Sequence, residues 1–264
     1  MRVKPNSLLA VLVGLTLNFG LSTTASAAPA IVGSWHIDLP NIQGVTTFLA
    51  DGTYFDAIDV TGDSVHTGIE WGNYSWNDIT GEVTATSLGD FNGNWGIAGD
   101  VDGSQFFSIS GDTASVFQPG CSGCGHSDER VLHPANSIVG TWLVPGGFAG
   151  TITFLANGSY IHGEEAHDGG LSGVERGTYS WDSVTGVLVT TSIVTDTNGV
   201  SGLSHPHGTT FVSLNASGCL TFTDDLGSGD LVAAPVPEAQ TYAMMLAGLG
   251  LVGGMAARRR KQIS

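Results

Sequence analysis

The body of this chain contains one pattern twice, and this internal repeat constrains the fold more than any other feature. Residues 31–35 (IVGSW) return as residues 138–142 (IVGTW), and residues 47–54 (TFLADGTY) return as residues 153–160 (TFLANGSY). Further segments recur in the same order, with an offset that stays between 105 and 107 residues. A nearly constant offset over this distance indicates duplication of a whole domain rather than an array of short repeats.

Each copy is expected to fold as a meander of antiparallel strands. Asp51-Gly52 and Asn157-Gly158 each stand between apolar alternating runs, and this is the strongest short signal for a β-hairpin. Turn signals recur at roughly 8–12 residues, the spacing of sandwiches and barrels, and we count about eight strands per copy. The body contains no convincing amphipathic helix.

The first strand of each copy carries a Gly-x-Trp tripeptide, at residues 33–35 and 140–142. This tripeptide at the start of a meander resembles lipocalin-like and avidin-like barrels, which implies closed barrels with a filled core or room for one small ligand. We predict an all-β protein with two tandem antiparallel up-and-down β-barrels; two packed β-sandwiches are the alternative. The predicted domains are residues 28–118 and 138–232, joined by a Cys-containing linker at 119–137.

The N-terminal end has the features of a secretory signal peptide. A basic start is followed by an apolar stretch at residues 8–21 and by the small residues Ala25 and Ala27. This order predicts a signal peptide at residues 1–27, with cleavage after the Ala-x-Ala site.

The C-terminal end combines three features in a fixed order. Val236, Pro237 and Glu238 form an extended, accessible stretch, because proline disfavours helix. The uncharged segment 241–257 follows, and as a helix it is about 25 Å long, close to the bilayer core of about 30 Å. A basic cluster then ends the segment and places that end in the cytoplasm; it consists of Arg258, Arg259, Arg260 and Lys261.

This order resembles the PEP-CTERM sorting domain of Gram-negative bacteria, at residues 235–262. The resemblance implies recognition by an exosortase-like processing enzyme, transient anchoring in the inner membrane, and export to the cell envelope, the cell surface or the exopolysaccharide matrix. Ala239 departs from the pattern, which usually has a second proline there, and this puts the efficiency of processing in question. A plain C-terminal membrane anchor is the alternative.

Without its two ends the chain is strongly acidic. Residues 28–234 contain two basic residues, Arg130 and Arg176, and 23 acidic residues, which gives a net charge of −21. Such a surface repels nucleic acid and anionic membranes, so neither is expected as a partner of the body. It favours cations, or a salty medium that screens the repulsion.

Cys121 and Cys124 form a CxxC pair between the two copies. After export, a local disulfide is the first interpretation, because the compartment is oxidising. A zinc site with His126 and His133 and a free or redox-active pair are the alternatives. Haem attachment is excluded, since it requires histidine at the position of Gly125.

Two polar turns are weak candidates for calcium ligands. The turns resemble the start of a calcium-binding loop, although positions 95 and 101 lack the glycine and glutamate of an EF-hand. Aspartate and asparagine before glycine also form ordinary turns, so both interpretations stay open. No other cofactor is expected. The four candidate residues are Asp90, Asn92, Asp196 and Asn198.

No catalytic motif is present: there is no nucleophile elbow, phosphate loop or metalloprotease helix. The leading hypothesis is therefore a non-enzymatic surface or matrix protein with a structural or interaction role. The second hypothesis is a barrel module that binds a small apolar ligand or a glycan, which an interior cavity would favour. The third is a secreted hydrolase, which requires two carboxylates about 5–10 Å apart in a cleft.

Overall fold

The computed structural model describes residues 28–93, 95–98, 104–121, 123–146, 149–166 and 171–236. The predicted signal peptide with Ala25 and Ala27, the predicted transmembrane segment 241–257 and the sorting-signal residues after Val236 lie outside these ranges. In the described part of the chain, no helix has the length and hydrophobicity needed to cross a bilayer.

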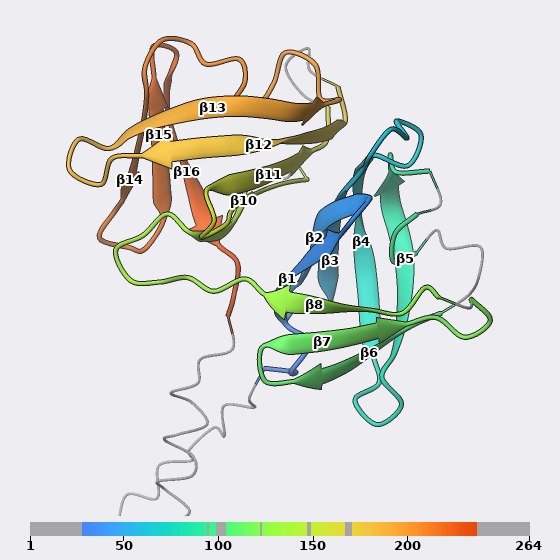
Figure 1. The fold of residues 1–264 in the computed structure, drawn as a ribbon. Coiled ribbons are helices and arrows are strands. Elements are labelled where there is room, and N and C mark those ends of the chain that lie inside the picture. The colour runs from blue at the N-terminus through green and yellow to red at the C-terminus, as the bar shows by residue number, and fades with distance from the viewer. Residues whose placement is uncertain are drawn as a thin grey trace, which may run out of the picture.

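The described residues form two closed antiparallel barrels of eight strands each, which confirms the predicted fold class (Figure 1). The first barrel contains β1 (Gly33–Leu39), β2 (Ile42–Phe48), β3 (Thr53–Val60), β4 (Gly68–Trp76), β5 (Glu82–Asp90), β6 (Gln105–Ser110), β7 (Thr113–Phe117) and β8 (His126–Arg130). The second contains β9 (Gly140–Leu143), β10 (Gly150–Phe154), β11 (Ser159–Glu164), β12 (Gly173–Trp181), β13 (Val187–Asp196), β14 (Thr210–Leu214), β15 (Leu220–Asp224) and β16 (Gly227–Ala233).

Each strand pairs with its neighbours in sequence, and the first and last strands of each copy close the barrel. β1 pairs with β8, and β9 pairs with β16. Closure pairs the first and last strands of each copy and so removes two open sheet edges, which protects a β-protein from edge-to-edge aggregation. The structure therefore shows barrels and not the two sandwiches of the alternative prediction.

The two cores repeat the same contacts. Trp35 is fully buried, and its Nε1 donates to the carbonyl oxygen of Ile31 at 2.8 Å. Trp142 donates in the same way to Ile138 at 2.7 Å. The predicted hairpin turns also match, since Gly52 has a φ of 88° and its counterpart in the second copy has a φ of 84°. Positive φ at a tight turn is readily adopted by glycine, which explains the Asp-Gly and Asn-Gly pairs.

The first barrel extends beyond its predicted end at residue 118. β8 lies inside the predicted linker 119–137, where it pairs with β7 and closes on β1. The sequence of β8, HSDER, was assigned to the linker because it is short and polar. Its two buried side chains belong to Asp128 and Arg130, so its inward face lacks the apolar alternation by which strands are recognised.

Arg130 seals one end of the first barrel. Its guanidinium carbon lies 4.0 Å from the centre of the Trp35 ring, a cation–π contact. Nη1 donates to the carbonyl oxygen of Val32 at 2.7 Å, and Nη2 donates to that of Ala30 at 2.9 Å. The arginine thereby fastens the N-terminal segment across the barrel end.

In the second barrel, a different residue covers the corresponding end. Ala233 occupies the place of Arg130, opposite Trp142. His133, from the connection between the barrels, packs edge-on against Trp142 with a ring separation of 5.1 Å. The backbone N–H of Thr141 donates to His133 Nε2 at 3.1 Å. Burial lowers the pKa of His133 to about 4, so its ring is neutral at physiological pH.

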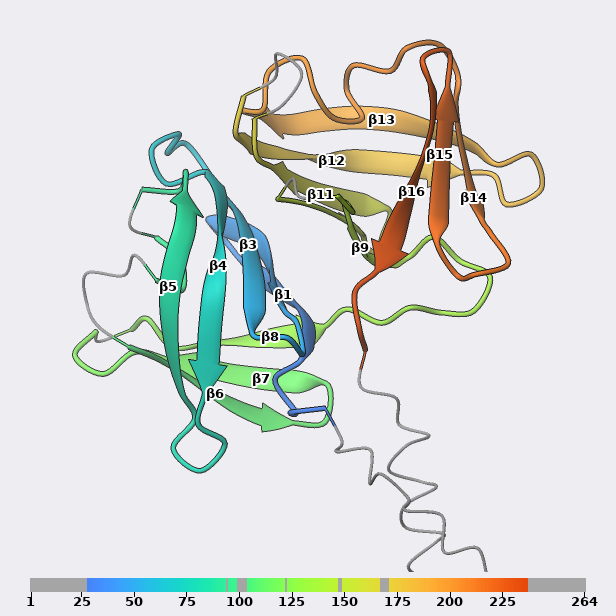
Figure 2. The same cartoon turned by 180° about the vertical axis from the view of Figure 1, so that it is seen from behind.

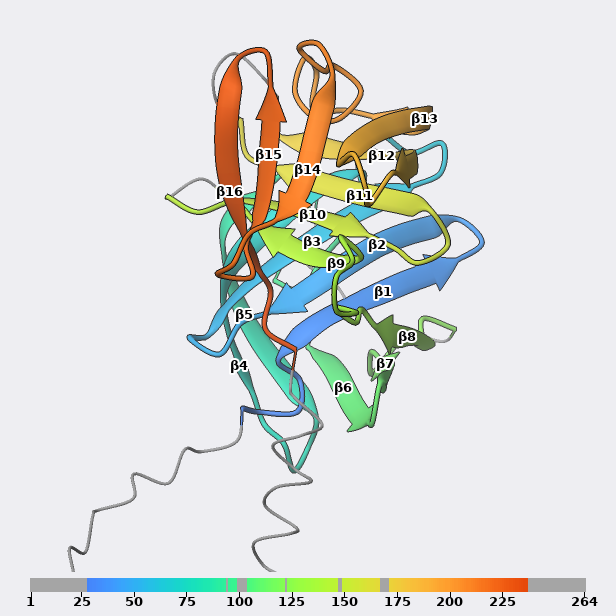
Figure 3. The ribbon, with the colours of Figure 1, turned by 90° about the vertical axis from the view of Figure 1, so that its left-hand side faces the viewer.

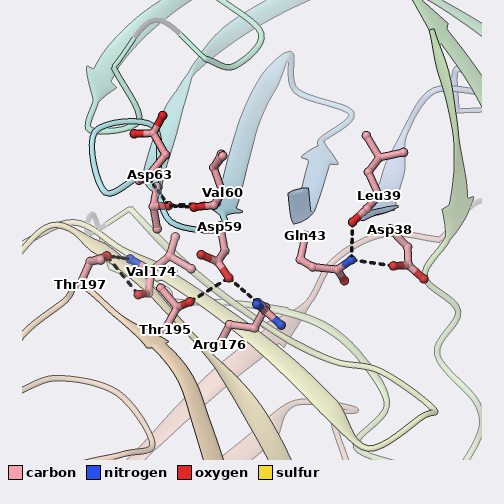
Figure 4. Close-up of polar contacts among 11 residues, drawn as sticks. Asp38, Leu39, Gln43, Asp59, Val60, Asp63, Val174, Arg176, Thr195 and Thr197 are labelled. Atoms are coloured by element: carbon pink, nitrogen blue, oxygen red, sulfur yellow. Dashed lines mark hydrogen bonds and ion pairs between the residues drawn. The ribbon is translucent and has the colours of Figure 1, made fainter. Parts of the chain in front are cut away.

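The two barrels pack side by side through β3 and β4 of the first and β10, β11 and β12 of the second (Figures 2 and 3). A small apolar cluster lies between them, and a buried aspartate adds a polar contact. Asp59 Oδ2 accepts hydrogen bonds from Arg176 Nε at 2.5 Å and from Thr195 Oγ1 at 2.8 Å (Figure 4). The apolar cluster consists of Val45, Ala57, Val131, Leu155, Ile161 and Val174.

Candidate functional site

The first barrel encloses a cavity of about 510 Å³. It opens beside the turn between β1 and β2, at the opposite end of β1 from the Trp35 and Arg130 seal. Gln43 holds this turn, since its Nε2 donates to Asp38 Oδ1 at 2.6 Å and to the carbonyl oxygen of Leu39 at 3.0 Å (Figure 4). The walls are largely apolar and include Ile37, Leu39, Ile58, Ile97, Phe107 and Val116.

Two buried carboxylates interrupt the apolar wall. Asp56 on β3 and Asp128 on β8 both line the cavity, and each is only 1% exposed. Thr46 donates from Oγ1 to Asp56 Oδ1 at 2.6 Å, whereas Asp56 Oδ2 has no hydrogen-bond partner. Asp128 Oδ1 also lacks a hydrogen bond, although His126 Nε2 lies 3.3 Å away as an ion-pair contact.

Burial governs the protonation of these groups. Burial, followed by the negative charge of Glu70, raises the pKa of Asp56 to about 8. Burial alone lowers the pKa of His126, but its contact with Asp128 outweighs this effect and the net pKa is raised. Burial and Glu70 therefore favour the neutral form of Asp56, whereas the contact with Asp128 favours the protonated form of His126.

The positive side chains of the body are engaged elsewhere. Arg130 stacks on Trp35 at the far end of the first barrel, and Arg176 binds Asp59 between the barrels. Among the described residues that line the cavity, His126 is the only basic one. An ionised Asp56 would therefore have no arginine or lysine beside it among the described residues that line the cavity.

Aromatic side chains and the CxxC loop form the rim. Trp95 and Phe117 line the cavity and are 40% and 48% exposed. Cys121 and Cys124 are joined by a disulfide with Cα atoms 5.5 Å apart, and Cys124 belongs to the rim. His133 packs on the second barrel, so the four residues of the alternative zinc site do not come together.

The second barrel has different side chains at the corresponding wall positions. The ring of Phe222 stacks on that of Phe154 with centres 6.4 Å apart, inside a continuous apolar core. His162 stands at the position of Asp56, because it pairs with Ile152 as Asp56 pairs with Thr46. The strand registers give the other equivalences in the cavity wall: Ile152 for Thr46, Phe222 for Val116 and Leu231 for Asp128.

The weak calcium candidates of the first copy do not face one another. Asp90 is exposed, and its Oδ1 accepts from the backbone N–H groups of Asn92 at 3.2 Å and Gly93 at 3.1 Å. Asn92 is fully buried. Asp90 thus stabilises its own turn, as expected of aspartate before glycine.

In the second copy, the calcium candidate Asp196 belongs to a cluster of possible metal ligands. Asn198 is buried and donates from Nδ2 to Glu164 Oε1 at 2.8 Å. Ligand atoms of Asp196, Glu175 and His205 lie within 4.8 Å of one another. The sequence interpretation missed Glu175, because only the pairing of β12 with β13 brings it beside Asp196.

Protein donors already occupy the buried member of this cluster. Glu175 Oε1 accepts from the Tyr160 hydroxyl at 2.6 Å and from the backbone N–H of Leu203 at 2.8 Å. Its Oε2 accepts from the backbone N–H of Ser204 at 3.0 Å and from the Ser204 hydroxyl. These contacts anchor the loop after β13 and give Glu175 a structural role.

Residues 235–261 match the PEP-CTERM protein-sorting motif. The chain carries a PEP-CTERM sorting motif. This motif indicates export, processing by an exosortase and a place in the cell envelope. The match begins at Pro235, directly after the second barrel, and ends within the basic cluster at Lys261. No curated protein matches the chain.

Proposed function

We propose that the exported protein is a non-enzymatic binding protein of the cell envelope, in which the first barrel holds a small molecule. One observation carries this proposal: the two copies share a fold, but the wall of the cavity in the first includes Val116 and Asp128, where the second has the larger apolar Phe222 and Leu231. The cavity volume of about 510 Å³ falls within the range of about 300–1,000 Å³ typical of small-molecule sites. The second barrel then serves as a packed structural support.

The energetic cost of burying polar groups without hydrogen bonds supports the same binding function. A buried polar group without a hydrogen bond costs about 1–3 kcal/mol, and an unpaired charge costs more. The first barrel keeps the buried Asp128 where the second barrel has the apolar Leu231, and it has Asp56 where the second has His162. Residues that lower stability in this way are expected at functional sites rather than in a purely structural core.

A secreted hydrolase is the second candidate function, and the pair Asp56 and Asp128 is the observation that favours it. Asp56 with a pKa of about 8 resembles a general acid, and Trp95 lies at the rim. We rank it second because an eight-stranded barrel admits one small molecule and not a polysaccharide chain. Release of a chromophore from nitrophenyl glycosides by the wild type, and its loss in Asp56→Asn, would favour this candidate.

Native mass spectrometry of the processed protein, recovered from cell envelopes, tests the binding function. We expect a co-purified small molecule that is released on denaturation. The matched control is Val116→Phe, which places in the cavity the residue found at the equivalent position of the second barrel. A wild type that carries no small molecule and gains none from an envelope extract would contradict the proposal, provided that the Val116→Phe protein behaves identically.

The finer steps of sorting are also part of the proposal. The sorting motif supports transient anchoring in the inner membrane, followed by release to the surface or the exopolysaccharide matrix. Fractionation of cells that express the full chain, or a chain that stops before Pro235, tests this order. We expect the full chain to leave the inner membrane in a processed form. Full-length protein that stays there with its tail intact would support a plain anchor instead.

A further inference from the structure

The carboxylates inside the first barrel indicate what kind of molecule the cavity accepts. Asp56 Oδ2 is a buried oxygen without a hydrogen-bond partner, and Asp128 Oδ1 has only the ion-pair contact with His126 Nε2 at 3.3 Å. Both side chains line the cavity, and both are 1% exposed. A ligand that completes these contacts must bring hydrogen-bond donors to this part of the wall.

The charges around Asp56 require that these donors be positive. β4 contributes Glu70, and β8 contributes Asp128 and His126, while β2 contributes only the neutral Thr46. Three buried carboxyl groups thus face one histidine. An added positive charge is attracted by this arrangement, and it interacts strongly because the site is buried.

We propose that the cavity binds a small organic cation, namely a protonated amine with an apolar body, whose ammonium group lies at Asp56 and Asp128. The inference rests on the proposed binding function. The ammonium N–H groups donate hydrogen bonds to the carboxylate oxygens. The apolar body of the ligand contacts walls such as Ile37, Ile58 and Phe107. Trp95 and Phe117 at the rim offer aromatic faces to a cation on its way in.

A bare metal ion fits the cavity less well than an organic cation. Calcium needs six to eight oxygen ligands, roughly at 2.3–2.6 Å. The cavity offers two carboxylates, Asp56 and Asp128, within walls that are largely apolar. An ammonium ion needs only a few acceptors and leaves its carbon chain in contact with those walls.

Binding of a cation also has a proton signature. Asp56 is largely protonated at neutral pH in the empty cavity, since burial and Glu70 raise its pKa to about 8. A cation stabilises the ionised carboxylate and so displaces this proton. The observed heat of binding then depends on the ionisation enthalpy of the buffer.

Isothermal titration of the processed protein with three matched probes tests the inference at pH 7.5. The probes are 2-phenylethylammonium, the neutral 2-phenylethanol and the anionic 3-phenylpropanoate. We expect the ammonium to bind at least about tenfold tighter than the alcohol, with proton release, and the anion not to bind. Asp128→Asn is expected to weaken the ammonium about tenfold or more and to leave the affinity for the alcohol nearly unchanged.

Two further variants make the outcome decisive. Asp56→Asn repeats the test at the second carboxylate, and thermal unfolding verifies that each variant is folded. Val116→Phe is expected to abolish binding of both the amine and the alcohol, because it fills the cavity. Equal affinities for amine and alcohol, or preference for the anion, would overturn the cation inference but leave a small-molecule site in place. Failure of all probes to bind would also overturn the cation inference. Native mass spectrometry of a co-purified molecule then tests the proposed binding function separately.

Discussion

Arg176 of the second barrel donates from Nε to Oδ2 of Asp59 in the first barrel, 2.5 Å away. Asp59 is only 2% exposed, and the hydroxyl of Thr195 donates to the same oxygen. One of the two basic side chains in residues 28–234 therefore neutralises a carboxylate at the barrel–barrel interface. The duplicated domains form one unit through this contact and the apolar cluster around it.

Removal of this cation is expected to destabilise the protein. Arg176→Met keeps much of the side-chain length but leaves Asp59 buried, with the Thr195 hydroxyl still donating to it. We expect the free energy of unfolding to fall by about 2–4 kcal/mol, measured by urea denaturation. In the double variant Asp59→Asn, Arg176→Met the loss should be smaller than the sum of the single losses, because no charge is left buried. Strict additivity would show that the two residues are not coupled.

Close approach of the barrels depends on Gly163 in β11. A Cβ atom at this position would lie 2.7 Å from Ala57 Cβ and 3.3 Å from Ile69 Cδ1, both in the first barrel. Gly163→Ala is therefore expected to push the barrels apart and to lower the free energy of unfolding by about 1–3 kcal/mol. Gly229→Ala in β16 is the matched control, because nothing lies within 4 Å of its Cβ. Equal unfolding midpoints for both variants would argue against tight packing at Gly163.

The barrels were predictable because their determinants are local and occur twice. Trp35 and Trp142 mark the first strand of each copy, and the glycines of the hairpins provide the positive φ that each turn requires. β8 was not predicted as a strand because its inward side chains, Asp128 and Arg130, are ionisable rather than apolar. Their burial is explained only by the cavity and by the Trp35 ring, and both are tertiary features.

The candidate site was not predictable from the sequence. Asp56 and Asp128 are 72 residues apart, and only the closed barrel brings them to one cavity. Whether that space is open depends on strand register, because Val116 aligns with Phe222 only after the strands are paired. The sequence offered one usable signal, namely that the repeat aligns Asp56 with His162 of the second copy.

Calcium is expected to have no effect on the cluster in the second barrel. Both oxygens of Glu175 already accept hydrogen bonds from protein donors, and Asp196 and His205 are exposed. Titration of the processed protein with millimolar calcium should give no specific heat and no rise in the unfolding temperature. Asp196→Asn should behave like the wild type in both measurements. A thermal shift present in the wild type and absent from the variant would instead establish a calcium site.

The stability of the second barrel is expected to rise with pH between about 4 and 6.5. Burial lowers the pKa of His133 to about 4, below its ordinary value of 6.5, so the unfolded chain binds more protons in this window. Acidification from pH 7 to pH 4.5 should therefore lower the free energy of unfolding, on the order of 2 kcal/mol from this group. His133→Gln keeps an acceptor for the Thr141 N–H and should reduce the dependence. An unchanged pH profile in this variant would assign the effect to other groups.

Asp56 is expected to lower the free energy of unfolding of the protein without a ligand. Its pKa is raised from 3.8 to about 8, so the folded protein binds the extra proton and loses stability as the pH rises through this window. Asp56→Asn removes the ionisable group and keeps the shape, and we expect it to raise the free energy of unfolding at pH 8.5 by about 2–4 kcal/mol. The gain should shrink as the pH falls to about 3, below the ordinary pKa of 3.8, where the carboxyl is mostly neutral in both states. The same variant should lose amine affinity, and a more stable protein with weaker binding is the combination expected of a ligand-binding carboxylate. Lower stability at pH 8.5 would show instead that the ionised Asp56 is satisfied within the fold.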